Sequence, residues 1–302
     1  MTNNSKYFMM KMKIKVITSV CLLFSVLLTA QSPVSGFMKK AGEGSVVVSY
    51  SQESYDKVFL VPMEVDGVPV FNEVNISSIS LFTEVGITDR LNVILNVPYI
   101  ESEGNASEAV LENNGFENTR SGLQDVKIYA KYLFHTFNTG SSTIDLMGAI
   151  GLETPLGDYS ADEGLQSIIA IGNESSSFNM LGTVHYKSAF GLFATGQAGY
   201  SFRGNKAPHA LLSELKLGYA GTHFYVDAFV ANQLSEKDGV DILGEGFEGF
   251  FPATRVNYTR VGVNLYVPVV SGIGVSGGAS TYVAGRNVGK ATGFYGGLVY
   301  SF

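Results

Sequence analysis

Cysteine is almost absent from this sequence, and tryptophan is missing altogether. The single cysteine, Cys21, lies in an amino-terminal stretch that we expect to be removed, so the mature chain offers neither a disulfide nor a thiolate metal site. The four histidines show no HExxH motif and no i, i+4 pair of the kind that binds zinc on a helix. We therefore predict no metal and no cofactor.

Long hydrophobic runs are also missing after residue 31. A membrane helix needs about 20 mostly apolar residues, and no later segment approaches that length. Backbone polar groups in lipid must all be paired, which leaves a closed barrel of strands as the other way to cross a membrane. Any membrane span of the mature chain is therefore predicted to be a strand.

The first thirty residues resemble an export signal. Four lysines precede an apolar run from Val16 to Leu28, and small residues follow at Thr29 and Ala30. This pattern predicts a cleaved signal peptide over 1–30 rather than a membrane anchor, because the apolar core is short and no positive cluster follows closely. We expect 31–42 to be a short periplasmic segment and 43–302 to form the outer-membrane barrel.

The mature chain is acidic. The precursor contains 20 basic and 27 acidic residues, and the leader removes four lysines and no acid, so the formal net charge falls from −7 to −11. Such a chain is a poor partner for nucleic acid.

Alternation of apolar and other residues recurs along the mature chain, at the period of two that is typical of strands. Twelve segments show it, although 10 to 14 strands fit the pattern: 43–52, 74–87, 91–100, 122–134, 142–154, 176–187, 191–203, 208–219, 222–234, 254–267, 272–284 and 291–302. Most of the longer connections alternate with tight turns, as extracellular loops and periplasmic turns do in outer-membrane barrels. We predict an all-β, antiparallel, up-and-down transmembrane barrel of about 12 strands, exported to the bacterial outer membrane.

The apolar faces of neighbouring segments match across the turns. Across Ala220-Gly221 the pattern pairs Leu211 with Val230, and in the first hairpin it pairs Leu81 with Val97. A slip of one residue would turn every side chain to the wrong face, so the match supports a continuous lipid-facing band.

The last segment, 292–302, is apolar on one face and ends in Phe302. An exposed apolar edge strand invites aggregation in a soluble protein, whereas pairing with the first strand closes a barrel. Such an ending resembles the signal that the barrel-assembly machinery reads, so we expect that machinery and outer-membrane lipid as partners. A soluble β-sandwich is the alternative.

Charged and aromatic side chains fall into two predicted groups. The inward candidates for the lumen are Lys127, Lys131, Asp145, Glu153, His185, Lys187, Glu214, Lys216, Asp227 and Arg260, and Glu84, Asp125 and Arg203 also fall on inward faces. A symmetric turn would place Lys131 opposite Asp145, and the Ala220-Gly221 turn would place Glu214 opposite Asp227. The predicted interface aromatics, near the short turns, are Tyr132, Phe134, Tyr186, Tyr219, Phe224, Tyr300 and Phe302.

The long loops are acidic. Residues 53–73, 101–121, 155–174 and 235–253 each carry a formal charge of −4. We expect either a mild preference for cations or divalent-ion bridging to lipid headgroups, with an ordinary solvated surface as the alternative.

Three stretches resemble a known family. Gly122–Phe134 contains GLQDVKIYAKYLF, Gly151–Tyr159 contains GLETPLGDY, and Ala198–Phe202 contains AGYSF. They are similar to strands of the outer-membrane family called MetA-pathway of phenol degradation. The resemblance implies a barrel that passes small molecules, including hydrophobic or aromatic ones.

Enzymatic motifs are weak. GEGFEG at 244–249 has the glycine spacing of a dinucleotide fingerprint, but its glutamates would repel a pyrophosphate and Pro252 follows where a helix should run. We therefore expect a passive channel for small solutes and no enzyme. A closed structural or adhesive barrel is the first alternative, and an outer-membrane hydrolase is the second.

Overall fold

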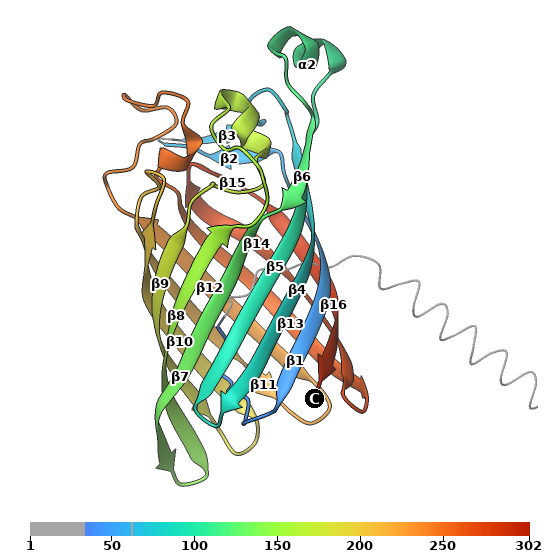
Figure 1. The fold of residues 1–302 in the computed structure, drawn as a ribbon, viewed down its shortest axis with the longest axis vertical. Helices are drawn as coiled ribbons and strands as arrows, with labels where there is room; N and C mark the ends of the chain where they lie inside the picture. The colour runs from blue at the N-terminus through green and yellow to red at the C-terminus, as the bar shows by residue number, and fades with distance from the viewer. Residues whose placement is uncertain (1–33, 62) are drawn as a thin grey trace, which may run out of the picture.

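The computed structural model describes residues 34–61 and 63–302, which form a closed antiparallel barrel (Figure 1). Its wall contains twelve strands in chain order, and the last strand pairs with the first. The strands tilt across the barrel, with the larger loops at one end and short turns at the other (Figure 1). No helix in the described residues is long and apolar enough to cross a membrane.

Each predicted segment corresponds to one wall strand. The wall strands are β1 (Gly44–Tyr55), β4 (Val74–Thr88), β5 (Leu91–Gly104), β7 (Asp125–Thr139), β8 (Ser142–Pro155), β9 (Ser177–Lys187), β10 (Leu192–Arg203), β11 (Ala210–Ala220), β12 (Tyr225–Ser235), β13 (Asn257–Val270), β14 (Ile273–Arg286) and β16 (Thr292–Ser301). A short strand, β6 (Thr119–Leu123), precedes β7 and pairs with the carboxyl-terminal part of β5, whereas β7 pairs with the first part of β5. The predicted all-β barrel is confirmed.

The distribution of side chains is inverted relative to a soluble protein. Outward residues such as Leu217, Leu152 and Leu298 are 55%, 60% and 64% exposed. Inward polar residues such as Lys131 and Asp227 are 0% and 2% exposed. Alternation along each strand produces both faces, so the exterior is suited to hydrocarbon and the interior to polar contacts.

The register confirms one predicted hairpin and corrects another. Leu81 faces Val97 in the β4–β5 pair, as the pattern predicts. In the β11–β12 pair, Leu211 faces Leu234 rather than Val230. The turn spans four residues, with the Gly221 amide donating to the Phe224 carbonyl, so the register differs by an even number and the faces are preserved.

The same shift removes the predicted contact between two carboxylates. Glu214 lies opposite Ala231, and Asp227 lies opposite Gly218. Glu214 instead forms an ion pair with Lys216 on its own strand, at 3.3 Å.

The predicted pairing of Lys131 with Asp145 is also wrong. The β7–β8 hairpin continues to Thr139 and Ser142, and a bulge between Leu133 and His135 shifts the register. Lys131 therefore lies opposite Ala149, and Asp145 lies opposite Thr136, whose Oγ1 donates to it at 2.5 Å.

The loop end carries the remaining elements. They are a small sheet of β2 (Lys57–Phe59), β3 (Glu64–Asp66) and β15 (Val288–Gly289), the helix α2 (Glu108–Asn114), and two 3-10 turns, η1 (Gly164–Ile169) and η2 (Phe251–Ala253). Ile169 of η1 is fully buried in a cluster with Phe71 and Val74, so the loop that contains η1 is packed onto the barrel mouth.

Candidate functional site

Described residues that precede β1, from Val34 onward, lie inside the barrel. Val34 is 2% exposed and packs in one apolar cluster with Ile94, Tyr129, Ala149 and Leu181 of the barrel wall. We call residues 34–40 the N-terminal segment. The predicted periplasmic segment 31–42 therefore has part of its described length inside the lumen.

Lys131 fastens this segment. Its Nζ donates to the carbonyl oxygens of Phe37 and Ser35 at 2.6 Å and 3.2 Å, and it lies 2.6 Å from Glu84 Oε1. Glu84 also accepts from Asn92 at 2.8 Å. Because Lys131 is fully buried, its charge is compensated by the carboxylate and by the backbone of the segment.

Aromatic contacts from the nearby strands β9 and β10 hold the same segment. The Phe37 ring lies 4.5 Å from the His185 ring and 5.1 Å from the Phe193 ring, both edge to face. His185 Nδ1 is hydrogen-bonded to Thr195 at 2.8 Å. Gly36 lets the segment approach the wall closely, since a Cβ there would lie 2.4 Å from His185 Nδ1.

A cavity of about 360 Å³, the inner cavity, lies within the barrel lumen. Leu181 and Gln197 line it, and Gln197 Nε2 donates to the Val34 carbonyl, so the N-terminal segment lies beside the cavity. Lys127 pairs with Glu153 at 3.2 Å in its wall. Glu153 is held further by the Tyr129 hydroxyl, which donates at 2.5 Å.

An ion pair connects the inner cavity to a second one. Arg260 lines the inner cavity and its Nη2 lies 2.6 Å from Glu53 Oε2, whereas Glu53 and Tyr282 line the next cavity. Arg260 also donates to Ser280 and to the Tyr282 hydroxyl at 3.1 Å and 3.2 Å.

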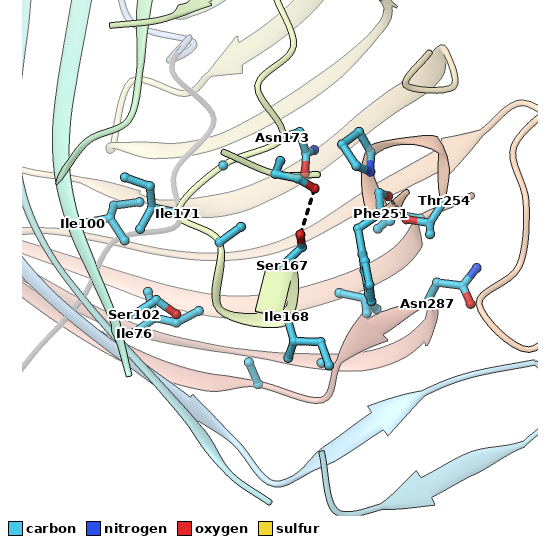
Figure 2. A pocket seen from close by; sticks show the side chains of 18 of the residues that line it. Ile76, Ile100, Ser102, Ser167, Ile168, Ile171, Asn173, Phe251, Thr254 and Asn287 are labelled. Carbon is cyan, nitrogen blue, oxygen red and sulfur yellow. Dashed lines mark hydrogen bonds between the residues drawn. The ribbon is translucent and has the colours of Figure 1, made fainter. Parts of the chain in front are cut away.

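This outer cavity, also of about 360 Å³, lies beside η1 and η2 at the loop end (Figure 2). Ile76, Ile100, Ile168, Ile171 and Phe251 contribute apolar wall. Polar groups come from Ser102, Asn173, Thr254 and Asn287. The buried Ser102 Oγ has no hydrogen-bond partner in the described part of the chain. The outer cavity thus combines apolar side chains with polar groups in similar measure.

Ion pairs anchor the loops around the outer cavity. Arg286 donates to both carboxylate oxygens of Asp241, at 2.7 Å and 2.5 Å. Hydrogen bonds from Arg286 hold the pKa of Asp241 below its usual range. Lys57 pairs with Asp66 and Lys290 with Glu64, so part of the acidic loop charge is already neutralised.

The structure divides the ten predicted lumen residues into groups. Lys127, Glu153, Glu214 and Arg260 line the inner cavity, and Lys216 joins them through its ion pair with Glu214. Lys131 and His185 contact the N-terminal segment. Asp227, buried, accepts from the Tyr225 hydroxyl and from Asn264. Asp145 and the exposed Lys187 lie near the turn end, and neither lines a cavity described here.

Six of the seven predicted interface aromatics form three pairs near the short turns. Ring contacts join Tyr132 with Phe134, Tyr219 with Phe224 and Tyr300 with Phe302, at 5.3 Å, 5.1 Å and 5.9 Å. All except the half-buried Tyr219 are exposed, and Tyr186 belongs to the exposed group.

Several residues of these sites lie outside the predicted set. Tyr258 lines the inner cavity beside Arg203, which was predicted to face inward; the parity of Tyr258 on its alternating strand would also place it inward. The loop residues Ile168 and Ile171 line the outer cavity, and their signal is an apolar run inside a loop expected to be solvated. Val34 and Phe37 carry no periodic signal, because the N-terminal segment is too short.

Two kinds of site bear on an enzymatic function, a metal cluster and a histidine–serine pair. No group of three or more histidine, cysteine, aspartate or glutamate side chains in residues 34–61 and 63–302 could hold a metal. Within the same ranges no histidine is hydrogen-bonded to a serine side chain; His185 contacts Thr195, and His223 contacts Thr222.

Comparison with solved structures identifies the architecture. A COG4313 outer membrane channel from Pseudomonas putida F1 superposes with a TM-score of 0.69 at 13% sequence identity, covering 90% of this chain and 100% of that one. The chain has the fold of an outer-membrane barrel. The KdgM porin matches with a TM-score of 0.47 at 10% identity, covering 85% of this chain and 99% of that one. No family model and no curated protein sequence matches the chain.

Proposed function

We propose that this protein is a passive outer-membrane channel for small molecules. The observation that carries the proposal is the pair of cavities inside the closed wall, joined at the Glu53–Arg260 ion pair. Apolar side chains cover the outside of that wall, as lipid-facing surfaces of outer-membrane barrels require. The twelve-stranded wall shares its fold with a COG4313 outer membrane channel, and the stretches 122–134 and 151–159 support membership of the phenol-degradation family.

The outer cavity supports solutes that combine an apolar body with a polar group. Its isoleucine and phenylalanine wall would bury the body, and the exposed side chain of Asn173 offers hydrogen-bonding groups to the polar end. The solute would then pass Glu53 and Arg260, cross the inner cavity and leave beside the N-terminal segment. Movement would follow the concentration gradient.

Liposome swelling tests passage. Vesicles that contain the folded protein should swell in isotonic solutions of small solutes such as glycine, faster than in raffinose, which is larger than either cavity can pass easily. Swelling at the rate of protein-free vesicles in every solute would count against a channel and favour a closed structural barrel.

The ends of the strands support two proposals about partners. We propose that the seven aromatics near the short turns lie at the periplasmic lipid interface, where amphipathic rings are stabilised. Phe302, at the end of the chain, is proposed to be read by the barrel-assembly machinery. A Phe302→Ala variant should then be inserted into the outer membrane less efficiently while the purified protein keeps its fold.

A further inference from the structure

Four of the five charged side chains that line the inner cavity are neutralised by partners. Lys127 pairs with Glu153, and Glu214 pairs with Lys216. Arg260 pairs with Glu53 and also donates hydrogen bonds to Ser280 and to the Tyr282 hydroxyl. The cavity therefore keeps its charges in closed pairs, with one exception.

The exception is Arg203. Among the described residues it has no carboxylate oxygen within 4.0 Å, and the stretches outside that description contain no aspartate or glutamate. Its Nε donates to Ser201 Oγ at 3.2 Å and its Nη2 donates to Gln233 Oε1 at 2.7 Å. Both acceptors are neutral, so they orient the guanidinium without compensating its charge.

Glu153 is the carboxylate that could compete for Arg203, but it is already occupied. Its Oε1 accepts from the Tyr129 hydroxyl at 2.5 Å and from Asn179 at 3.1 Å, and its Oε2 lies 3.2 Å from Lys127 Nζ. A guanidinium has five N–H groups in a planar fork. Three of those of Arg203 therefore have no acceptor among the described residues.

A second donor lines the same cavity. The Tyr258 hydroxyl has no hydrogen-bond partner in the described part of the chain, and Tyr258 lines the cavity together with Arg203. Gln233 Nε2 donates to the Val256 carbonyl at 2.9 Å, so the side chain that orients Arg203 is itself held in place. Apolar wall lies nearby in Leu181, Leu212 and Phe229.

We propose that Arg203 and Tyr258 bind the carboxylate of a small monocarboxylic acid whose apolar body rests against Leu181, Leu212 and Phe229. The proposal deepens the channel function and rests on it for the route by which the solute reaches the site. A planar guanidinium fork matches a carboxylate with two parallel hydrogen bonds. One unpaired positive charge selects a monoanion, and a cavity of about 360 Å³ fits an acid of benzoate size.

The acidic loops do not contradict this site. The loop carboxylates influence an ion as it approaches from solution, where salt screens exposed charges. Arg203 lines the inner cavity, where the screening of its charge is weaker. The outer rim would slow the arrival of anions and the inner cavity would retain those with the right shape.

Calorimetric titration of the folded full-length protein in detergent tests the site, with benzoate and its neutral analogue benzamide as probes. Benzoate should bind at least tenfold more tightly than benzamide. Arg203→Gln should weaken benzoate binding at least tenfold and leave benzamide unchanged, and Tyr258→Phe should weaken it severalfold. Arg203→Lys, which keeps the charge but loses the fork, should fall between the wild type and Arg203→Gln.

The matched control is Arg120→Gln, which removes the same charge from the loop end, where Arg120 pairs with Glu163. It should bind benzoate like the wild type. Equal binding of benzoate and benzamide, no benzoate binding, or benzoate binding that survives Arg203→Gln would overturn the site. If vesicles that contain the protein swell in small solutes but benzoate does not bind specifically, the site is wrong and the channel stands. If benzoate binds specifically but the vesicles do not swell, the site stands and the channel is wrong.

Discussion

Replacing the buried ion pair of Lys131 and Glu84 should release the N-terminal segment from the lumen. In the double variant Lys131→Met/Glu84→Gln, both members of a buried ion pair become neutral together. The barrel then keeps no buried unpaired charge, whose cost would be about 3–5 kcal/mol if one partner alone were removed. The segment, however, loses its donor to the Phe37 and Ser35 carbonyls.

The loss can be compared with what still holds the segment. Hydrogen bonds to a charged donor contribute about 1.5–3 kcal/mol each, so the two carbonyl contacts together contribute about 3–6 kcal/mol. Burial of Val34 contributes about 1.5–3 kcal/mol. The edge-to-face contacts of Phe37 with His185 and Phe193 add about 0.5–1.5 kcal/mol each. The double variant thus removes about as much of the free energy that holds the N-terminal segment in the lumen as these remaining contacts supply.

Single-channel recording in planar bilayers measures the result. We expect the double variant to show a larger conductance, or frequent steps to a larger level, because the segment leaves the lumen for part of the time. The single variant Glu84→Gln is the control, since Lys131 keeps its carbonyl contacts there; it should conduct like the wild type and unfold more easily. Wild-type conductance from the folded double variant would refute the assignment of Lys131 as the fastener.

Three further predictions follow from individual contacts. Gly36→Val should also raise the conductance, because a Cβ would lie 2.4 Å from His185 Nδ1 and 2.8 Å from Thr195 Oγ1; an unchanged conductance would place the segment elsewhere. Leu215→Lys puts a charge on the lipid-facing side at mid-strand and should lower the free energy of unfolding in lipid vesicles by about 2–4 kcal/mol, as measured by urea titration. Asp241 has a pKa lowered by Arg286, so its ion pair is present above the ordinary value of 3.8 and is lost as the pH falls through the lower folded value. Limited proteolysis should therefore cut residues 236–256 faster only in acid, whereas Asp241→Asn should be cut faster at neutral pH as well; equal rates for both proteins at neutral pH would contradict this.

The wall of the barrel was predictable because its two faces face two different solvents. Alternation such as that of Leu215, Lys216 and Leu217 is readable residue by residue, and an even error in register does not change it. Pair contacts were less predictable. A four-residue turn after Ala220 and a bulge beside Leu133 moved Asp227 and Asp145 away from their expected partners, and turn length is set by backbone geometry that alternation does not record.

The cavities depend on contacts that are remote in sequence. Val34 meets Leu181 and Gln197, and Ile168 and Phe251 come together from two loops. Neither contact has a local pattern. Arg203 was predictable as an inward residue, but its unpaired charge became visible only when the partners of Lys127, Glu153 and Arg260 were known.

A single-channel recording of the folded wild-type protein tests the account most directly. Folding is verified first on a gel, where an unboiled membrane barrel migrates differently from a boiled one. We predict discrete, ohmic current steps in potassium chloride, small because the N-terminal segment occupies part of the lumen. A heat-modifiable barrel that inserts into the bilayer and carries no current would contradict the channel.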